Sequence, residues 1–219
     1  TLAISVNNIF YSIAMFGIRN YQVSDVKEKY SNNIYIYSRM LSCLIAIVLC
    51  WGYCMIVGYS GMQKKCIIIY CLFKMSEAFY DVFAGIEQRE WRMDYIGKSW
   101  MYRGIVTFVC FLGGLYISKN LSIAIAGMMI SSFLIIVIYD IPVTKKIADL
   151  KSSSSIEQCF CLMKECFPLL CYLMISTIVT MLPRLIMERK LGSYAMGVYG
   201  SVSAPTVIVQ MGASYIFNP

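Results

Sequence analysis

Three charged side chains stand inside one apolar run of the chain, CIIIYCLFKMSEAFYDVFAG. Lys74 precedes Glu77 by three residues, and Glu77 precedes Asp81 by four, so on a helix all three fall within an arc of roughly 60°. A charge in hydrocarbon costs about 2.5–3.5 kcal/mol, and this face is therefore expected to line a bundle interior or a hydrated cavity. The three residues are candidates for cation coupling, with Glu77 and Asp81 as possible carriers of H⁺ or Na⁺. The structural alternative is an ion pair between Lys74 and Glu77.

Arginines occur in three other apolar runs. Arg39 lies near one end of its run, Arg184 follows a proline, and Arg103 lies just inside a run that begins at Trp100. Guanidinium groups bind phosphate with bidentate geometry, so arginines that point inward suit an anionic, phosphate-bearing cargo. Each could instead snorkel to the membrane interface, and for Arg103 snorkelling is the expected arrangement.

The composition predicts an integral membrane protein. Of the 219 residues, 59% are hydrophobic and 14% are charged, and the mean hydropathy is +0.66. Soluble domains have about 45–50% apolar and about 25% charged residues. The net charge of +7 is attributed to cytoplasmic loops, and no nucleic-acid partner is predicted. With no histidine, and with most of its ten cysteines inside apolar runs, the chain indicates no metal site, cofactor or disulfide framework.

The apolar runs predict an all-α fold with about seven transmembrane helices, because a helix needs about 20 residues to cross a bilayer. The expected spans are 2–18, 34–59, 66–86, 100–117, 121–141, 159–187 and 197–217. Alternate loops carry nine Lys and Arg against five in the others. The positive-inside rule therefore predicts that the first, third and fifth loops are cytoplasmic.

Three segments of different character are predicted. Residues 1–143 would form most of a first transmembrane lobe, residues 144–158 a cytoplasmic linker, and residues 159–219 the start of a second lobe. The run Ser152–Ser155 is typical of a flexible linker. The chain starts and ends within apolar sequence, and it is expected to be a fragment whose first lobe lacks its first helix.

Three stretches resemble bacterial polysaccharide flippases of the multidrug/oligosaccharidyl-lipid/polysaccharide exporter superfamily. They are GIRNYQVSDVKEKYS from Gly17, FYDVFAGIEQREWRMDYIGKSWMYRGI from Phe79 and PRLIMERKLGSYAMGVYGSVSAPTVIVQ from Pro183. The resemblance implies two lobes around a central cavity in the bacterial cell membrane. It matches the family's basic cavity positions to Arg19, Arg39 and Arg184. No catalytic residue comes with it.

The resemblance further implies a transporter and not an enzyme. The expected cargo is an oligosaccharide on undecaprenyl pyrophosphate, turned from the inner to the outer leaflet by alternating access and coupled to H⁺ or Na⁺. Membrane lipids are the other expected partner. A multidrug/cation antiporter of the same superfamily stays open as an alternative, and so does a membrane-embedded polysaccharide polymerase or acyltransferase. These enzymes usually need a large polar loop or a histidine-based site, and neither is present in this sequence.

Overall fold

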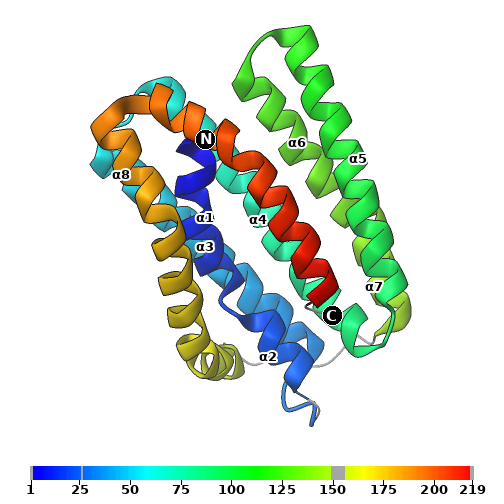
Figure 1. Cartoon of the computed structure of the whole chain (residues 1–219). Coiled ribbons are helices and arrows are strands. Elements are labelled where there is room, and N and C mark those ends of the chain that lie inside the picture. The colour runs from blue at the N-terminus through cyan, green and yellow to red at the C-terminus, as the bar shows by residue number, and fades with distance from the viewer. Residues whose placement is uncertain (1, 26, 149–155, 218–219) are drawn as a thin grey trace.

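The chain forms a bundle of helices (Figure 1). A computed structural model describes residues 2–25, 27–148 and 156–217, and no strand occurs in this part of the chain. The helices are α1 (Leu2–Met15), α2 (Ile18–Ser24), α3 (Asn32–Val57), α4 (Gly61–Arg89), α5 (Met93–Ser118), α6 (Leu121–Ile135), the π-helix η1 (Ile136–Asp140), α7 (Ile141–Ile147) and α8 (Ile156–Phe217).

The prediction of an all-α membrane protein is confirmed. Within the described ranges, four helical stretches are long and apolar enough to cross a membrane, namely 32–57, 93–118, 121–147 and 156–192. Helix α4 is also long, with 29 residues, but it carries the predicted charged face. Helix α1 has 14 residues because it ends where the backbone turns at Phe16 and Gly17. Four of the seven predicted spans, 34–59, 100–117, 121–141 and 159–187, overlap these stretches. The other three correspond to α1 with the start of α2, to part of α4 and to the second part of α8.

Local signals explain where the long helices begin and end. Ser60 accepts a hydrogen bond from the backbone N–H of Gln63, whose side chain accepts one from Ser60 N–H, so a capping box starts α4. Gly58 ends α3 with φ 72°, in the left-handed region that glycine adopts readily. Asn120 caps α6 by accepting a hydrogen bond from Ser122 N–H.

Helix α8 has two arms joined at Gly192. The backbone there is non-helical, with φ 83° and ψ 170°, and Figure 1 shows the chain turning back so that α1 is seen between the two arms. The predicted break between residues 187 and 197 is therefore confirmed. Pro168, Pro183 and Pro205 lie inside the two arms without ending them. Prolines inside membrane helices are tolerated in this way because neighbouring groups satisfy the freed backbone carbonyls.

Small residues bring α5 and α6 close together. A Cβ added at Gly114 would lie 3.0 Å from the Cα of Ala124, and one added at Gly127 would lie 3.3 Å from the backbone oxygen of Cys110. Such contacts are typical of helices packed in membranes. The opposite side of α5 exposes large apolar side chains, as expected for a surface that faces lipid: Ile105, Phe108, Val109, Leu112, Tyr116 and Ile117.

The loops predicted to be cytoplasmic meet at one end of the bundle. Arg89, at the end of α4, pairs with Glu28 at 3.2 Å and donates to the side chain of Asn32 at 3.4 Å. Ile147 and Gln158 line a cavity of about 580 Å³ with these residues. In the predicted linker, α7 runs to residue 147 and α8 begins at residue 156, while residues 149–155 lie outside the described part.

Candidate functional site

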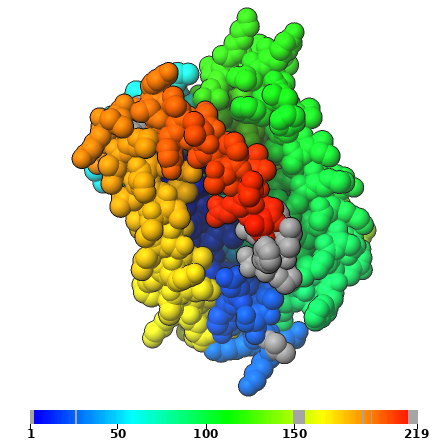
Figure 2. All heavy atoms as spheres, in the orientation of Figure 1, coloured from blue at the N-terminus to red at the C-terminus, as the bar shows by residue number. Residues whose placement is uncertain are grey.

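A cavity of about 610 Å³ lies between the helices of the predicted first lobe and the first arm of α8. In the space-filling view this face is hollowed, and the dark blue of α1 is visible between the two arms of α8 (Figure 2). Several polar residues stand among the apolar surface of the wall: Asn8, Tyr11, Ser12, Arg19, Asn20, Asp81, Gln88, Thr177 and Thr180. A volume of this size is typical of pockets that bind small molecules or cofactors.

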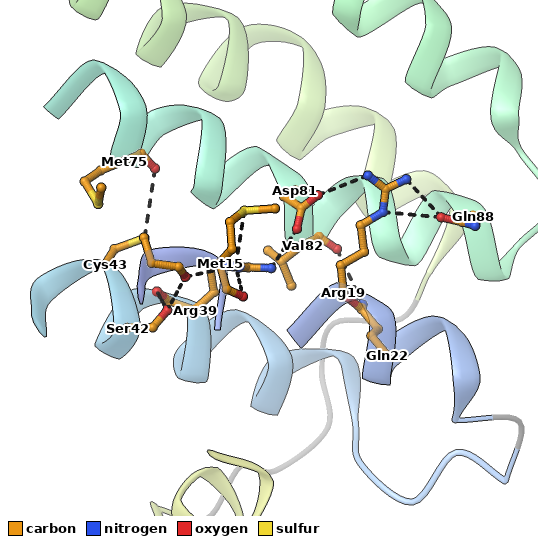
Figure 3. Close-up of polar contacts among 11 residues, drawn as sticks. Met15, Arg19, Gln22, Arg39, Ser42, Cys43, Met75, Asp81, Val82 and Gln88 are labelled. Atoms are coloured by element: carbon orange, nitrogen blue, oxygen red, sulfur yellow. Dashed lines mark hydrogen bonds and ion pairs between the residues drawn. The ribbon is translucent and has the colours of Figure 1, made fainter. Parts of the chain in front are cut away.

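Arg19 lines the cavity, and hydrogen bonds to neighbouring side chains fix the position of its guanidinium group. One of its terminal nitrogens pairs with Asp81 Oδ1 at 3.0 Å, and its Nη2 and Nε donate to Gln88 Oε1 at 2.9 and 3.3 Å (Figure 3). The side chain keeps 29% of its surface exposed. A preorganised, partly exposed guanidinium can bind a phosphate group from its free side.

The break between α1 and α2 places Arg19 on the wall. Phe16 and Gly17 both have positive φ, 47° and 67°, and they redirect the chain before α2 begins at Ile18. A Cβ added at Gly17 would lie 2.5 Å from the side chain of Leu169 on α8. Glycine is therefore required there by the backbone conformation and also by the close approach of α8.

Arg39 does not line this cavity, because its side chain is completely buried. It pairs with Asp81 Oδ2 at 2.8 Å, and it donates to the backbone oxygens of Ala14 and Met15 at 3.0 and 2.6 Å (Figure 3). The guanidinium thus binds the last carbonyls of α1, where a cation is favourable. In this conformation Arg39 positions the helix break and does not offer a surface to cargo.

Asp81 uses both carboxylate oxygens to hold the two arginines. The sequence placed it with Glu77 as a pair of carboxylates, but the closest charges around Asp81 are positive. A cation would have to displace at least one guanidinium to bind there. Within this arrangement Asp81 acts as the anchor of Arg19 and Arg39.

Lys74 and Glu77 form the ion pair that their spacing predicts, with Nζ 2.6 Å from Oε2. Their side chains are 19% and 14% exposed. The ammonium group also lies over the ring of Tyr11, 5.1 Å from its centre, and Tyr11 lines the main cavity. The pair is therefore separated from the cavity by one aromatic side chain.

Arg184 lies apart from the other predicted phosphate ligands. Its guanidinium stands 5.9 Å from the ring centre of Tyr199, on the second arm of α8. It lines a smaller cavity of about 400 Å³, together with Ser5 of α1 and Met196. The structure thus brings Arg19 and Arg39 together through Asp81 but does not bring Arg184 to them.

The expectation that Arg103 snorkels to the interface is wrong. Its side chain is 3% exposed, pairs with the completely buried Asp140 at 2.8 Å and donates to Ser132 at 2.7 Å. Sequence reasoning overlooked Asp140. A signal was available, because Arg103 lies near the start of one predicted span and Asp140 near the end of the next. In antiparallel neighbours those positions have the same depth.

At the predicted cytoplasmic end, polar contacts connect α8 to α2 and to the segment between α2 and α3. Lys29 and Tyr21 both donate to the carboxylate of Glu165, and the hydrogen bond to Glu165 raises the pKa of Lys29. Burial acts to raise the pKa of Asp25 in the same segment. The hydrogen bonds it accepts, from two backbone N–H groups and the Tyr35 hydroxyl, outweigh that effect and leave its pKa below the ordinary value.

Comparison with known proteins adds the decisive observation. The family described as polysaccharide biosynthesis protein matches residues 1–218. The chain belongs to this family. The capsular polysaccharide biosynthesis protein CapF of Staphylococcus aureus is 25% identical over 195 residues, which cover 86% of this chain and 48% of that relative. The chain thus spans about half of the relative's length. No solved structure matches.

Membership of the polysaccharide biosynthesis family confirms the resemblance drawn from the three sequence motifs. Together with the long apolar helices, it shows a multi-pass membrane protein of polysaccharide biosynthesis. The matched region includes the whole described cavity, so the cavity belongs to the part of the chain that the family shares.

Proposed function

We propose that the chain is part of a flippase for lipid-linked oligosaccharides. The cargo would be an oligosaccharide unit on undecaprenyl pyrophosphate, turned from the inner to the outer leaflet during surface polysaccharide biosynthesis. The relative in Staphylococcus aureus is named for capsular polysaccharide biosynthesis, which supports this cargo class. Transport, and not a chemical reaction, is the activity we assign to the whole protein.

The partly exposed Arg19 on the cavity wall carries this proposal. Asp81 and Gln88 engage three of the five N–H groups of the guanidinium, and the remaining N–H groups are the donors that a pyrophosphate needs. Across the cavity, the hydroxyl oxygens of Thr177 and Thr180 of α8 can accept hydrogen bonds from sugar hydroxyls, because their own protons are donated to backbone carbonyls of α8. A drug/cation antiporter would be better served by an acidic and aromatic wall that lacks arginine.

Glu77 is our candidate for the residue that binds the coupling cation. Binding of H⁺ or Na⁺ to its carboxylate would release Lys74, whose ammonium group lies over the Tyr11 ring. Because Tyr11 lines the cavity, a movement of its ring would change the shape of the cavity wall. In this scheme Asp81 and Arg39 position Arg19 and take no part in carrying the cation.

Alternating access would open one end of the cavity at a time. The first arm of α8 begins the proposed second lobe, and residues 144–158 would connect the lobes. Glu165 of α8 is bound by Lys29 and Tyr21, which belong to the proposed first lobe. These contacts join the two proposed lobes at the end that the charge distribution predicts to be cytoplasmic. They would have to break for cargo to enter from the inner leaflet.

Replacing Arg19 by alanine is expected to reduce export of surface polysaccharide at least tenfold. A hydrogen bond to a charged group contributes about 1.5–3 kcal/mol, and each 1.4 kcal/mol is a tenfold change in binding. The full-length protein is expressed in a bacterial strain that lacks its own flippase. Surface polysaccharide is then measured by antibody binding to intact cells, and the amount of protein in the membrane by immunoblot.

Arg92→Ala is the matched control for this experiment. Arg92 is an exposed arginine that pairs with Asp94 at 3.0 Å, so its loss should leave export unchanged. Wild-type export by Arg19→Ala at an equal membrane level would contradict the site. Drug resistance without restored polysaccharide would favour the antiporter. Restored polymer length, in a strain that retains a flippase but lacks its polymerase, would favour an enzyme.

A further inference from the structure

A second buried polar network lies between α4 and the helix pair α5–α6, outside the cavity described above. Its centre is the ion pair of Arg103 with Asp140, and Ser99 donates to the same carboxylate at 2.6 Å. The guanidinium of Arg103 also lies 4.5 Å from the ring centre of Tyr80 on α4. The charges of Arg103 and Asp140 therefore compensate each other within the network.

Glu87 of α4 adds a further carboxyl group at the edge of this network. Its side chain is completely buried. Oε1 accepts a hydrogen bond from the Thr144 hydroxyl at 3.5 Å, which is the outer limit for such a bond, and Oε2 has no hydrogen-bond partner. Among the ion pairs formed by the described residues, none includes Glu87.

The surroundings of Glu87 disfavour a negative charge. The titratable and charged groups around it come from four elements: Asp140 and Tyr139 from η1, Asp94 from α5, Arg19 from α2, and Tyr80 from α4 itself. Two of these are carboxylates, and Arg19 is already engaged by Asp81. From α7, the Thr144 hydroxyl donates to Glu87, and the helix also carries Lys145 and Lys146 in its last turn. An ionised carboxylate that is buried without a cation costs several kcal/mol, whereas a protonated one is a neutral donor and acceptor.

We propose that Glu87 is a proton-binding site, which gains and loses its proton close to neutral pH in this conformation. The protonated carboxyl is neutral, so neither Asp140 nor Asp94 repels it. Loss of the proton leaves a carboxylate that is stable only where water or a cation can reach it. The proton on Glu87 therefore stabilises the packing of α7 against α4.

The π-helix η1 supplies a way to expose this site. It has five residues, ends at Asp140 and leads directly into α7, which carries Thr144. Single π-turns occur often at functional sites in helices. Resolving the π-turn into α-helix would shift the register of α7 by one residue, a rotation of about 100°. Such a rotation takes Thr144 away from Glu87 and opens the carboxyl to solvent.

Infrared spectroscopy of the full-length protein in lipid nanodiscs tests this inference. A protonated carboxylic acid has a C=O stretching band that an ionised carboxylate lacks. At neutral pH we expect this band in the wild type and its loss in Glu87→Gln, a variant that keeps the size and neutrality of the protonated side chain. Glu90→Gln, which changes the nearby exposed acid of the α4 cap, should leave the band unchanged.

Two results would overturn the proton site. One is a Glu87→Gln spectrum identical to that of the wild type. The other is loss of the band in Asp140→Asn while Glu87→Gln retains it, which would place the proton on Asp140. The readout does not depend on transport, so it stands or falls independently of the proposed flippase activity.

Discussion

Asp81→Asn is expected to destabilise the protein by about 3–5 kcal/mol, because it leaves the completely buried Arg39 without a counter-charge. The amide has nearly the same shape as the carboxylate, so the loss reports charge and not packing. Thermal unfolding of the purified full-length protein in nanodiscs measures the effect, and the amount inserted in membranes gives a second readout. Arg19 would also lose its partner, so export should fall with stability.

Asp94→Asn provides the comparison for this variant. Asp94 pairs with Arg92 and Lys98, but all three side chains are about half exposed, and such pairs contribute about 0–1 kcal/mol. Combining Asp81→Asn with Arg39→Gln should recover at least 1 kcal/mol relative to the sum of the single changes, since the unpaired charge is removed. Equal stability of Asp81→Asn and Asp94→Asn would show that Asp81 does not compensate a buried charge.

Arg103→Leu is expected to cost about 3–5 kcal/mol, because the carboxylate of Asp140 would stay buried without its cation. Asp140→Leu should cost about as much for the converse reason. Replacing both residues by leucine should recover part of the loss, because the double variant leaves no unpaired charge in the interior. The same unfolding assay gives all three values.

The exposed counterpart of this pair is Lys98 with Asp94, at 3.7 Å. Lys98→Leu should change stability by less than about 1 kcal/mol. If the two single leucine variants of the buried pair were as stable as Lys98→Leu, the Arg103–Asp140 contact would have no structural importance. Additive losses in the double variant would mean that the two side chains do not interact.

Features that depend on neighbouring residues in the sequence were predicted well. Runs of apolar residues predicted the helices, since a chain in a bilayer must satisfy its backbone hydrogen bonds internally. The spacing of Lys74 and Glu77 predicted their ion pair. The break in α8 follows from the charged stretch between two apolar runs, although only the structure places it at Gly192.

Contacts between distant segments could not be predicted in the same way. Asp81 meets Arg19 and Arg39 from positions 62 and 42 residues away, and no local spacing encodes such an encounter. As a result Asp81 was grouped with Glu77, its neighbour on the helix. The π-turn that ends at Asp140 and the backbone break at Gly17 depend on packing against other helices. The apolar pattern of the sequence therefore does not reveal them.

Direct binding of a pyrophosphate-bearing lipid tests the central claim that Arg19 holds the cargo's charged group. The full-length protein in nanodiscs is titrated with undecaprenyl pyrophosphate and, in parallel, with the uncharged undecaprenol. We predict a clear preference for the pyrophosphate, reduced at least tenfold by Arg19→Ala and unchanged by Arg92→Ala. Equal affinity for the two lipids, or pyrophosphate binding that Arg19→Ala leaves intact, would contradict the account.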